Sequence, residues 1–166
     1  MLMKHEAVIY LNSDVRKKRG RKMKHKPSIE DLNYLNSFQI YKIDASMFHH
    51  REHLQIAYTL LAERCIEDAY RELKNNILAL LTHLGVGTEK YHETMTYAWL
   101  LAVKHFMAIS APCNSFKGFI ESNSILLDKT IMSAHYSNQL MSSKLAKEKY
   151  VQPDLEPIPL HTEKIA

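Results

Sequence analysis

The segments FHHREHLQIAYTLL (48–61) and KYHETMTYAWLLAVKHF (90–106) decide the fold of this chain. In both segments apolar residues recur every three or four positions, which places them on one face of an α-helix. Neither segment contains Gly or Pro, so nothing in them interrupts a helix. They predict two amphipathic helices, over 47–63 and 88–109, that lie side by side at the centre of the molecule.

The composition of the whole chain agrees with a helical domain. The chain has 166 residues, which is the length of one ordinary domain and enough to bury a core without disulfides. Hydrophobic residues make up 46% of it, only four Gly and five Pro are present, and no strand-like alternation of useful length occurs. We therefore expect an all-α fold, a compact irregular bundle of five to seven helices.

Turn and cap signals divide the chain into three parts. Residues 1–26 form a basic N-terminal extension, 27–150 the helical bundle, and 151–166 an extended tail with three Pro in seven residues. Within the bundle, Ser28 is a candidate N-cap for a first helix, and Asp44 or Ser46 for the next. The periodic pattern either breaks near Cys65 or continues through it, and it ends before Gly85. Thr88 is a candidate cap for the second central helix.

The positive charge of the chain is concentrated in one run. Residues 16–26, RKKRGRKMKHK, hold eight Lys or Arg, and without them the net charge of +4 becomes −4. Such a run predicts a poorly ordered segment that could contact nucleic acid or acidic surfaces, or act as a solubilising tail. A second reading places the start of translation at Met23, which would remove most of the run.

The chain lacks paired cysteine spacing and a long apolar run, and both features bear on its location in the cell. Cys65 and Cys113 have no paired spacing, which favours ordinary reduced thiols. No run of about 18 apolar residues is present, so we expect no membrane span. These features predict a cytoplasmic protein.

Three histidines near the predicted starts of the two central helices are the candidate site. On a helical wheel of about 100° per residue, His92 heads the face that carries Trp99 and Val103, and His50 and His53 lie within the apolar arc of the other helix. His105 falls on the opposite face, where we expect it to be solvated.

Three neutral imidazoles can hold a transition metal and leave a position open for water or substrate. The pattern therefore predicts a zinc or iron site with His50, His53 and His92 as ligands. Glu93 or Tyr91 would then orient a ligand or act as an acid–base group. Hydrolysis and oxidation both remain open, and so does the question of whether the protein is an enzyme.

Several alternatives accompany this prediction. His49 could replace His50, and His49-x-x-Glu52-His53 also fits the inverted zinc-protease signature, although that signature belongs to larger folds. Glu89-x-x-His92 has the spacing of di-iron bundles, but the chain lacks the second such pair. Histidines on apolar helix faces are also common as core residues bonded to a carbonyl oxygen.

The order of these motifs resembles that of a known family. Phe48-x-His50-x-x-His53-Leu54 is followed by Lys90-Tyr91-His92-Glu93-Thr94, then Tyr136-Ser137, then Pro153-Asp154-Leu155-x-Pro157. Over about residues 29–160 this is similar to a family of small, uncharacterised bacterial all-helical proteins. The resemblance implies a compact bundle with histidines at positions 50, 53 and 92, and it favours His50 over His49. It implies no substrate.

Two other functions are compatible with the sequence. In one, the histidines are structural or sense pH, and the basic extension recruits an acidic partner. In the other, Trp99, Tyr58 and His92 build a pocket for a small molecule, without metal.

Overall fold

The computed structural model describes residues 24–161 and confirms the all-α prediction. It contains no β-strand within that range. The five α-helices of seven residues or more are α2 (Ile29–Gln39), α3 (His50–Glu63), α4 (Ile66–His83), α5 (Glu93–Ile109) and α6 (Phe116–Ser122). Two short α-helices, α7 (Asn138–Met141) and α8 (Lys144–Glu148), and four 3-10 helices, η1 (Ala45–Met47), η2 (Thr88–Lys90), η3 (Ser124–Leu127) and η4 (Lys129–Ala134), complete the bundle.

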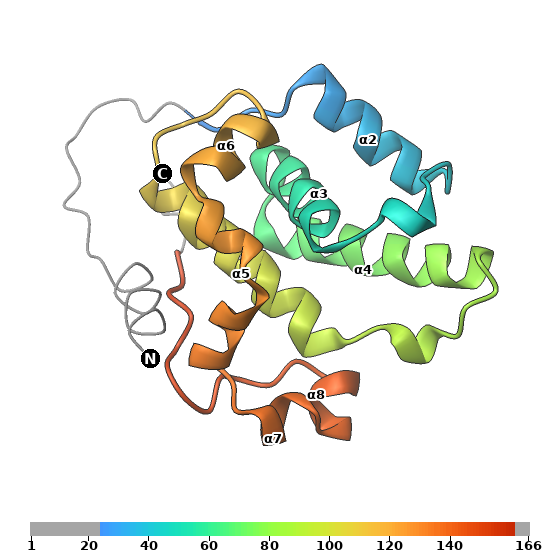
Figure 1. The fold of residues 1–166 in the computed structure, drawn as a ribbon, viewed down its shortest axis with the longest axis vertical. Helices are drawn as coiled ribbons and strands as arrows, with labels where there is room; N and C mark the ends of the chain where they lie inside the picture. The colour runs from blue at the N-terminus through green and yellow to red at the C-terminus, as the bar shows by residue number, and fades with distance from the viewer. Residues whose placement is uncertain (1–23, 162–166) are drawn as a thin grey trace.

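Helices α3 and α5 form the centre, as their periodicity predicts. They pack against each other, with α2 and α4 beside α3 and with α8 against α5 (Figure 1). Their shared core is almost wholly excluded from water: Ile56 and Leu60 of α3 and Leu100 and Val103 of α5 have no exposed surface. This apolar seam fixes how the first turns of the two helices lie relative to each other.

Ser28 begins α2 as expected. Its side chain accepts a hydrogen bond from Asp31 N, and Asp31 in return accepts one from Ser28 N, which makes a capping box. Asp31 is buried and also accepts hydrogen bonds from Gln55 Nε2 of α3 and from Phe116 N of α6, at 2.9 and 2.8 Å. One carboxylate therefore joins three helices.

Both central helices begin later than their sequence predicts. Asp44 caps the short helix η1 through Ser46 N, whereas α3 starts at His50 with His49 as its N-cap. Likewise Thr88 belongs to η2, and α5 starts at Glu93 with His92 as N-cap. A 3-10 turn thus takes the place of the first turn expected for each helix. The sequence pattern places His92 on the helical wheel of the second central helix, but in the structure His92 lies just before that helix, α5.

Of the two alternatives left open near Cys65, the structure has the break. Helix α3 ends at Glu63 and α4 begins at Ile66, with Cys65 as its N-cap. The end of α4 at His83 is also as expected. It is followed by Gly85, which adopts a φ of +66°, and this left-handed backbone favours Gly after a helix.

The prediction that His105 is solvated is wrong. Its exposed fraction is only 2%, and its Nδ1 lies 2.7 Å from Nε2 of His161 in the C-terminal tail. The tail runs back along the bundle beside α5, and its Ile158 is buried (Figure 1). A helical wheel of α5 alone could not show that a distant segment covers its outer face.

The last residues of the predicted basic extension contact the bundle. His25 is buried, and its ring is bonded to Met107 O and to Cys113 N, while Lys26 N donates to Cys113 O. The His25 ring and the backbone of Lys26 are thus held against the bundle. The rest of the basic extension predicted over 1–26, and its expected contacts with nucleic acid or acidic surfaces, lie outside the described residues.

The tail predicted over 151–166 is extended where the structure describes it. Residues 151–161 contain no helix. Ser137 N and Oγ both donate to the carboxylate of Asp154, and Leu155 N donates to His135 O. These bonds fasten the start of the tail to the end of η4. Among the described helices, none combines the length and apolar character needed to cross a membrane.

Candidate functional site: a histidine-lined pocket

A half-enclosed pocket of about 490 Å³ opens where α3, α4 and α5 meet. We call it the histidine pocket. Its apolar wall comes from Leu54 and Ala57 of α3, Leu73 and Ile77 of α4, and Trp99 of α5. Its other lining residues are Phe48, His49, His50, His53, Lys90, Tyr91, His92, Met95, Thr96, Leu100 and Lys129. All three predicted histidine ligands and Tyr91 therefore lie on one pocket, which the chain assembles from four separate segments.

His50 is held by the polypeptide backbone and by an aromatic ring. Its Nε2 lies 2.8 Å from Leu126 O, so Nε2 carries the proton and donates it. Its ring meets the Trp99 ring edge-on, with centroids 4.4 Å apart. Burial lowers the pKa of His50, and the nearby Lys129 lowers it further. His50 is thus a neutral side chain whose Nδ1 has no partner within residues 24–161.

His53, one turn further along α3, has no hydrogen bond to its ring within the described residues. The ring lies 4.2 Å from that of Phe48, centroid to centroid. Burial, and after it the proximity of His50, lowers the pKa of His53 to about 4. A neutral imidazole has one donor and one acceptor, and here both lack a protein partner.

His92 has both ring nitrogens occupied. Nδ1 accepts the hydrogen bond from Met95 N that caps α5, at 3.2 Å, and Nε2 donates to Met141 O at 2.8 Å. The side chain therefore joins the start of α5 to the end of α7. His92 lines the pocket with a ring whose orientation is fixed by these two hydrogen bonds.

The two predicted acid–base residues have different surroundings. Glu93 does not line the pocket; its carboxylate accepts hydrogen bonds from Tyr70 and from Lys74, whose Nζ is 2.9 Å away. Burial raises the pKa of Glu93. Tyr91 does line the pocket, and its hydroxyl is the buried side-chain polar atom that has no hydrogen-bond partner among residues 24–161.

The Tyr91 hydroxyl is withdrawn from solvent. Burial raises its pKa, and the hydroxyl of Thr96 offsets part of the rise. Thr96 itself donates its proton to His92 O at 2.9 Å. Because buried polar groups in proteins nearly always have partners, an unpartnered hydroxyl on a pocket wall indicates a place for a ligand group.

The three rings, as arranged, do not fit a metal ion. Coordination by His92 would break either its cap or its bond to Met141, and His50 offers only Nδ1. Within residues 24–161 no group of three or more His, Cys, Asp or Glu side chains has the arrangement of a metal site. The zinc or iron site stays a prediction.

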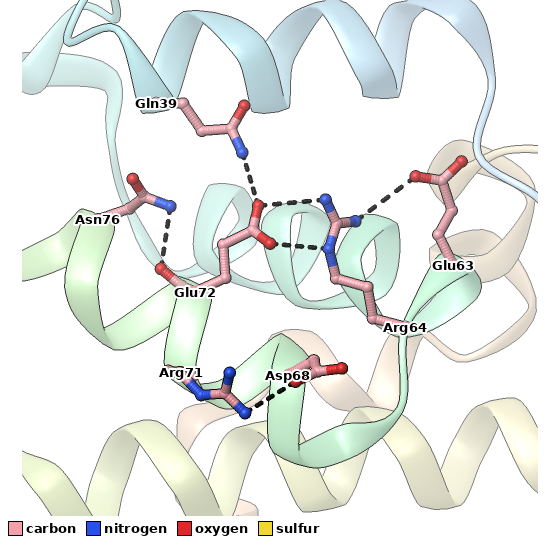
Figure 2. Close-up of polar contacts among 7 residues, drawn as sticks. All are labelled: Gln39, Glu63, Arg64, Asp68, Arg71, Glu72 and Asn76. Carbon is pink, nitrogen blue, oxygen red and sulfur yellow. Dashed lines mark hydrogen bonds and ion pairs between the residues drawn. The ribbon is translucent and has the colours of Figure 1, made fainter.

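A second hollow, lined by Arg64, Arg71 and Glu72, lies over the junction of α2 with α4, and it differs in character. Its volume is about 580 Å³ and it is open and polar. Figure 2 shows that its charges pair with one another: Glu72 accepts hydrogen bonds from Gln39 and Arg64, and Asp68 accepts one from Arg71. These charges need no ligand to neutralise them, so the histidine pocket is the better candidate site.

Comparison of the chain with protein-family models, curated proteins and solved structures gave no match. The similarity to a bacterial family that the motifs indicate is therefore untested by these comparisons. The assignment of a function depends on the geometry of the pocket.

Sequence reasoning missed two contributors to the site. Lys129, which lines the pocket, comes from η4, and the carbonyl of Leu126 that holds His50 comes from η3. Both follow a Pro-interrupted stretch whose path cannot be read from local periodicity. Tyr58, which sequence reasoning placed beside Trp99, instead donates to the carbonyls of Lys26 and Cys113 inside the core.

Proposed function

We propose that the protein binds a small organic molecule with a largely apolar body in the histidine pocket. The observation that carries the proposal is the combination of an apolar wall with polar side chains that have no partner. The volume lies within the range of about 300–1,000 Å³ that is usual for small-molecule sites. Trp99 and Leu73 offer the contact surface, while His53 and Tyr91 offer hydrogen bonds.

The partial exposure of Trp99 supports this reading over a purely structural one. Trp99 is partly buried although it lies on the face of α5 that turns toward α3. The side chain touches His50 yet still borders the pocket. A ligand that covers the indole would remove apolar area from water, which is worth about 25 cal/mol per Å².

Binding of a neutral fluorescent probe, N-phenyl-1-naphthylamine, tests the proposal. We expect saturable binding of one probe per chain. Ala57→Phe should weaken it, because Ala57 lines the pocket and a larger side chain fills it. The same substitution at the exposed Ala45 of η1 is the control and should leave binding unchanged.

Absence of saturable binding to the folded wild-type protein would overturn the proposal. Equal binding by wild type and a folded Ala57→Phe variant would overturn it too, since the probe would then lie elsewhere. Circular dichroism and a thermal melt establish that both variants are folded. Should Ala57→Phe fail to fold, Met95→Trp fills the same pocket from a partly buried position on α5.

A further inference from the structure

The polar lining of the histidine pocket is neutral or cationic throughout. Its sixteen residues include four histidines and two lysines, but no Asp or Glu. This is not a general property of the protein, because the chain outside residues 16–26 has a net charge of −4. Acidic side chains are common on the molecule and are missing from this one concave surface.

The two lysines of the pocket have no anionic partner. Neither Lys90 nor Lys129 forms an ion pair with a carboxylate of residues 24–161. Lys74, which lies close to the same wall over the ring of Tyr91, behaves differently: its Nζ is 2.9 Å from the carboxylate of Glu93. The cation next to the pocket is thus neutralised by the protein, whereas the two that line it are not.

The charge of Lys129 acts on the inside of the pocket. After burial, which has the largest effect, this ammonium group is one of the influences that lower the pKa values of His50 and His53. Glu52 acts in the opposite sense on both rings, but it does not line the pocket, and its carboxylate accepts a hydrogen bond from His49 N. At His50 the effect of Lys129 is larger than that of Glu52, whereas at His53 the effect of Glu52 is the larger of the two. Of these two side chains, the cation therefore dominates at His50, and this favours an anion beside that ring.

Two hydrogen-bond donors without a partner complete the arrangement. One is the hydroxyl of Tyr91, and the other is the N–H of the neutral His53 ring. A carboxylate has two oxygens and about four acceptor positions, so it can accept from both donors and from an ammonium group at once. A neutral ligand could use the hydrogen bonds but would gain nothing from the charges of the two lysines, which are exposed to solvent.

We propose that the ligand is an organic monocarboxylate, with its apolar chain against Trp99 and its carboxylate bound by Lys129, Lys90 and the hydroxyl of Tyr91. The inference rests on the proposed function, since it names the class of molecule that the same pocket binds. It adds one distinguishing statement: the charge of the ligand contributes to its affinity.

A matched pair of ligands, octanoate and octanamide, tests this statement, because the two differ in charge and share the same alkyl chain. Calorimetry on the wild-type protein should give an affinity for octanoate about fivefold higher than for octanamide, which is the upper end of what one exposed charge pair contributes. That advantage should shrink as salt is added, whereas the affinity for octanamide should not fall.

Three variants test which side chains favour octanoate over octanamide. Lys129→Met should lower the affinity for octanoate about three- to fivefold and leave octanamide unchanged. Lys117→Met, at an exposed position on α6 away from the pocket, should change neither. Tyr91→Phe removes only a hydroxyl that has no protein partner, so the variant should fold normally and still lose affinity for octanoate.

The possible results separate the two proposals. If the neutral naphthylamine binds but octanoate does no better than octanamide, the carboxylate inference is overturned and the binding function stands. The same holds if Lys129→Met and Lys117→Met behave alike. If neither the naphthylamine nor either alkyl ligand binds, the binding function fails and the carboxylate inference fails with it.

Discussion

At the scale of single residues, three histidines on one pocket have three different tasks. His92 uses both nitrogens to cap α5 and to hold Met141 O. His50 uses one nitrogen to hold Leu126 O and packs against Trp99. His53 has neither nitrogen engaged by residues 24–161. The residue type and spacing were readable from the sequence, but the tasks depend on carbonyl groups from α7 and η3.

The neutral state of His53 predicts a pH dependence of stability. Its folded pKa of about 4 lies below the unfolded value of 6.5, so the unfolded chain binds the proton more tightly. The free energy of unfolding should therefore fall as the pH drops from 6.5 to 4, with His53 contributing up to about 3 kcal/mol. Below the folded pKa this contribution stays constant.

Urea unfolding of wild type and His53→Gln between pH 7 and pH 4 measures this effect. The variant cannot titrate at position 53, so its stability should decline less steeply over this interval. His50 also has a lowered pKa, so some decline should persist in the variant. Identical slopes for the two proteins would contradict a buried, neutral His53.

The structural task of His92 gives a second prediction. His92→Ala should lower the free energy of unfolding by about 1–2 kcal/mol, through loss of the cap and of the bond to Met141. His92→Asn keeps a cap acceptor and should recover part of the loss. Thermal melts of wild type and both variants measure these losses. Repeating the melts with added zinc or iron tests the metal prediction. A metal-dependent stabilisation of wild type that both variants lose would show that His92 is a ligand.

At the scale of elements, the carboxylate of Asp31 shows how a short helix is fixed to the bundle. Burial raises its pKa, but hydrogen bonds from Phe116 N, Ser28 and Gln55 outweigh this effect, so the net shift is downward. Asp31 therefore stays ionised in the folded protein. It holds α2 against α3 and the start of α6.

Removing the charge of Asp31 should lower the free energy of unfolding more than removing the charge of the exposed Glu30. We expect Asp31→Asn to lower the free energy of unfolding by about 2–3 kcal/mol, the range for hydrogen bonds to a charged group. Glu30→Gln, in the same helical turn but exposed, is the control and should have a small effect. Equal losses in chemical denaturation would mean that Asp31 does not join the helices.

The elements also show what sequence patterns could and could not predict. Ser28 followed by Asp31 predicted a helix start correctly, because a cap is a local interaction. The start of α5 was predicted too early because Thr88 is a residue type that favours a helix cap, whereas in the structure His92 caps α5 and is also held by Met141 O. Both central helices and their pairing were predicted from periodicity, whereas the η3 and η4 segments that complete the pocket were not.

At the scale of the whole molecule, the C-terminal tail closes the bundle on the outer side of α5. It is fastened at Asp154 and at Leu155, and Ile158 is buried in the core cluster. The extended form of the tail was predicted from its prolines. Its effect on His105 was not, because that contact joins residues more than 50 positions apart.

The tail offers a matched pair of substitutions. Ile158→Ala should lower the free energy of unfolding by about 2 kcal/mol, since its exposed fraction is only 5%. Leu160→Ala, two residues away with an exposed fraction of 68%, should change it little. A negligible effect of Ile158→Ala in urea unfolding would mean that the tail does not contribute to the core.

The central claim for the whole molecule is that the pocket beside Trp99 binds a ligand. Trp99 is the only tryptophan of the chain, so its indole N–H gives a single cross-peak in a ¹⁵N-correlated NMR spectrum. We predict that titration with octanoate moves this peak saturably, together with the amide signals of His53 and Tyr91. A Trp99 peak that stays in place both with octanoate up to its solubility limit and with N-phenyl-1-naphthylamine would contradict the account.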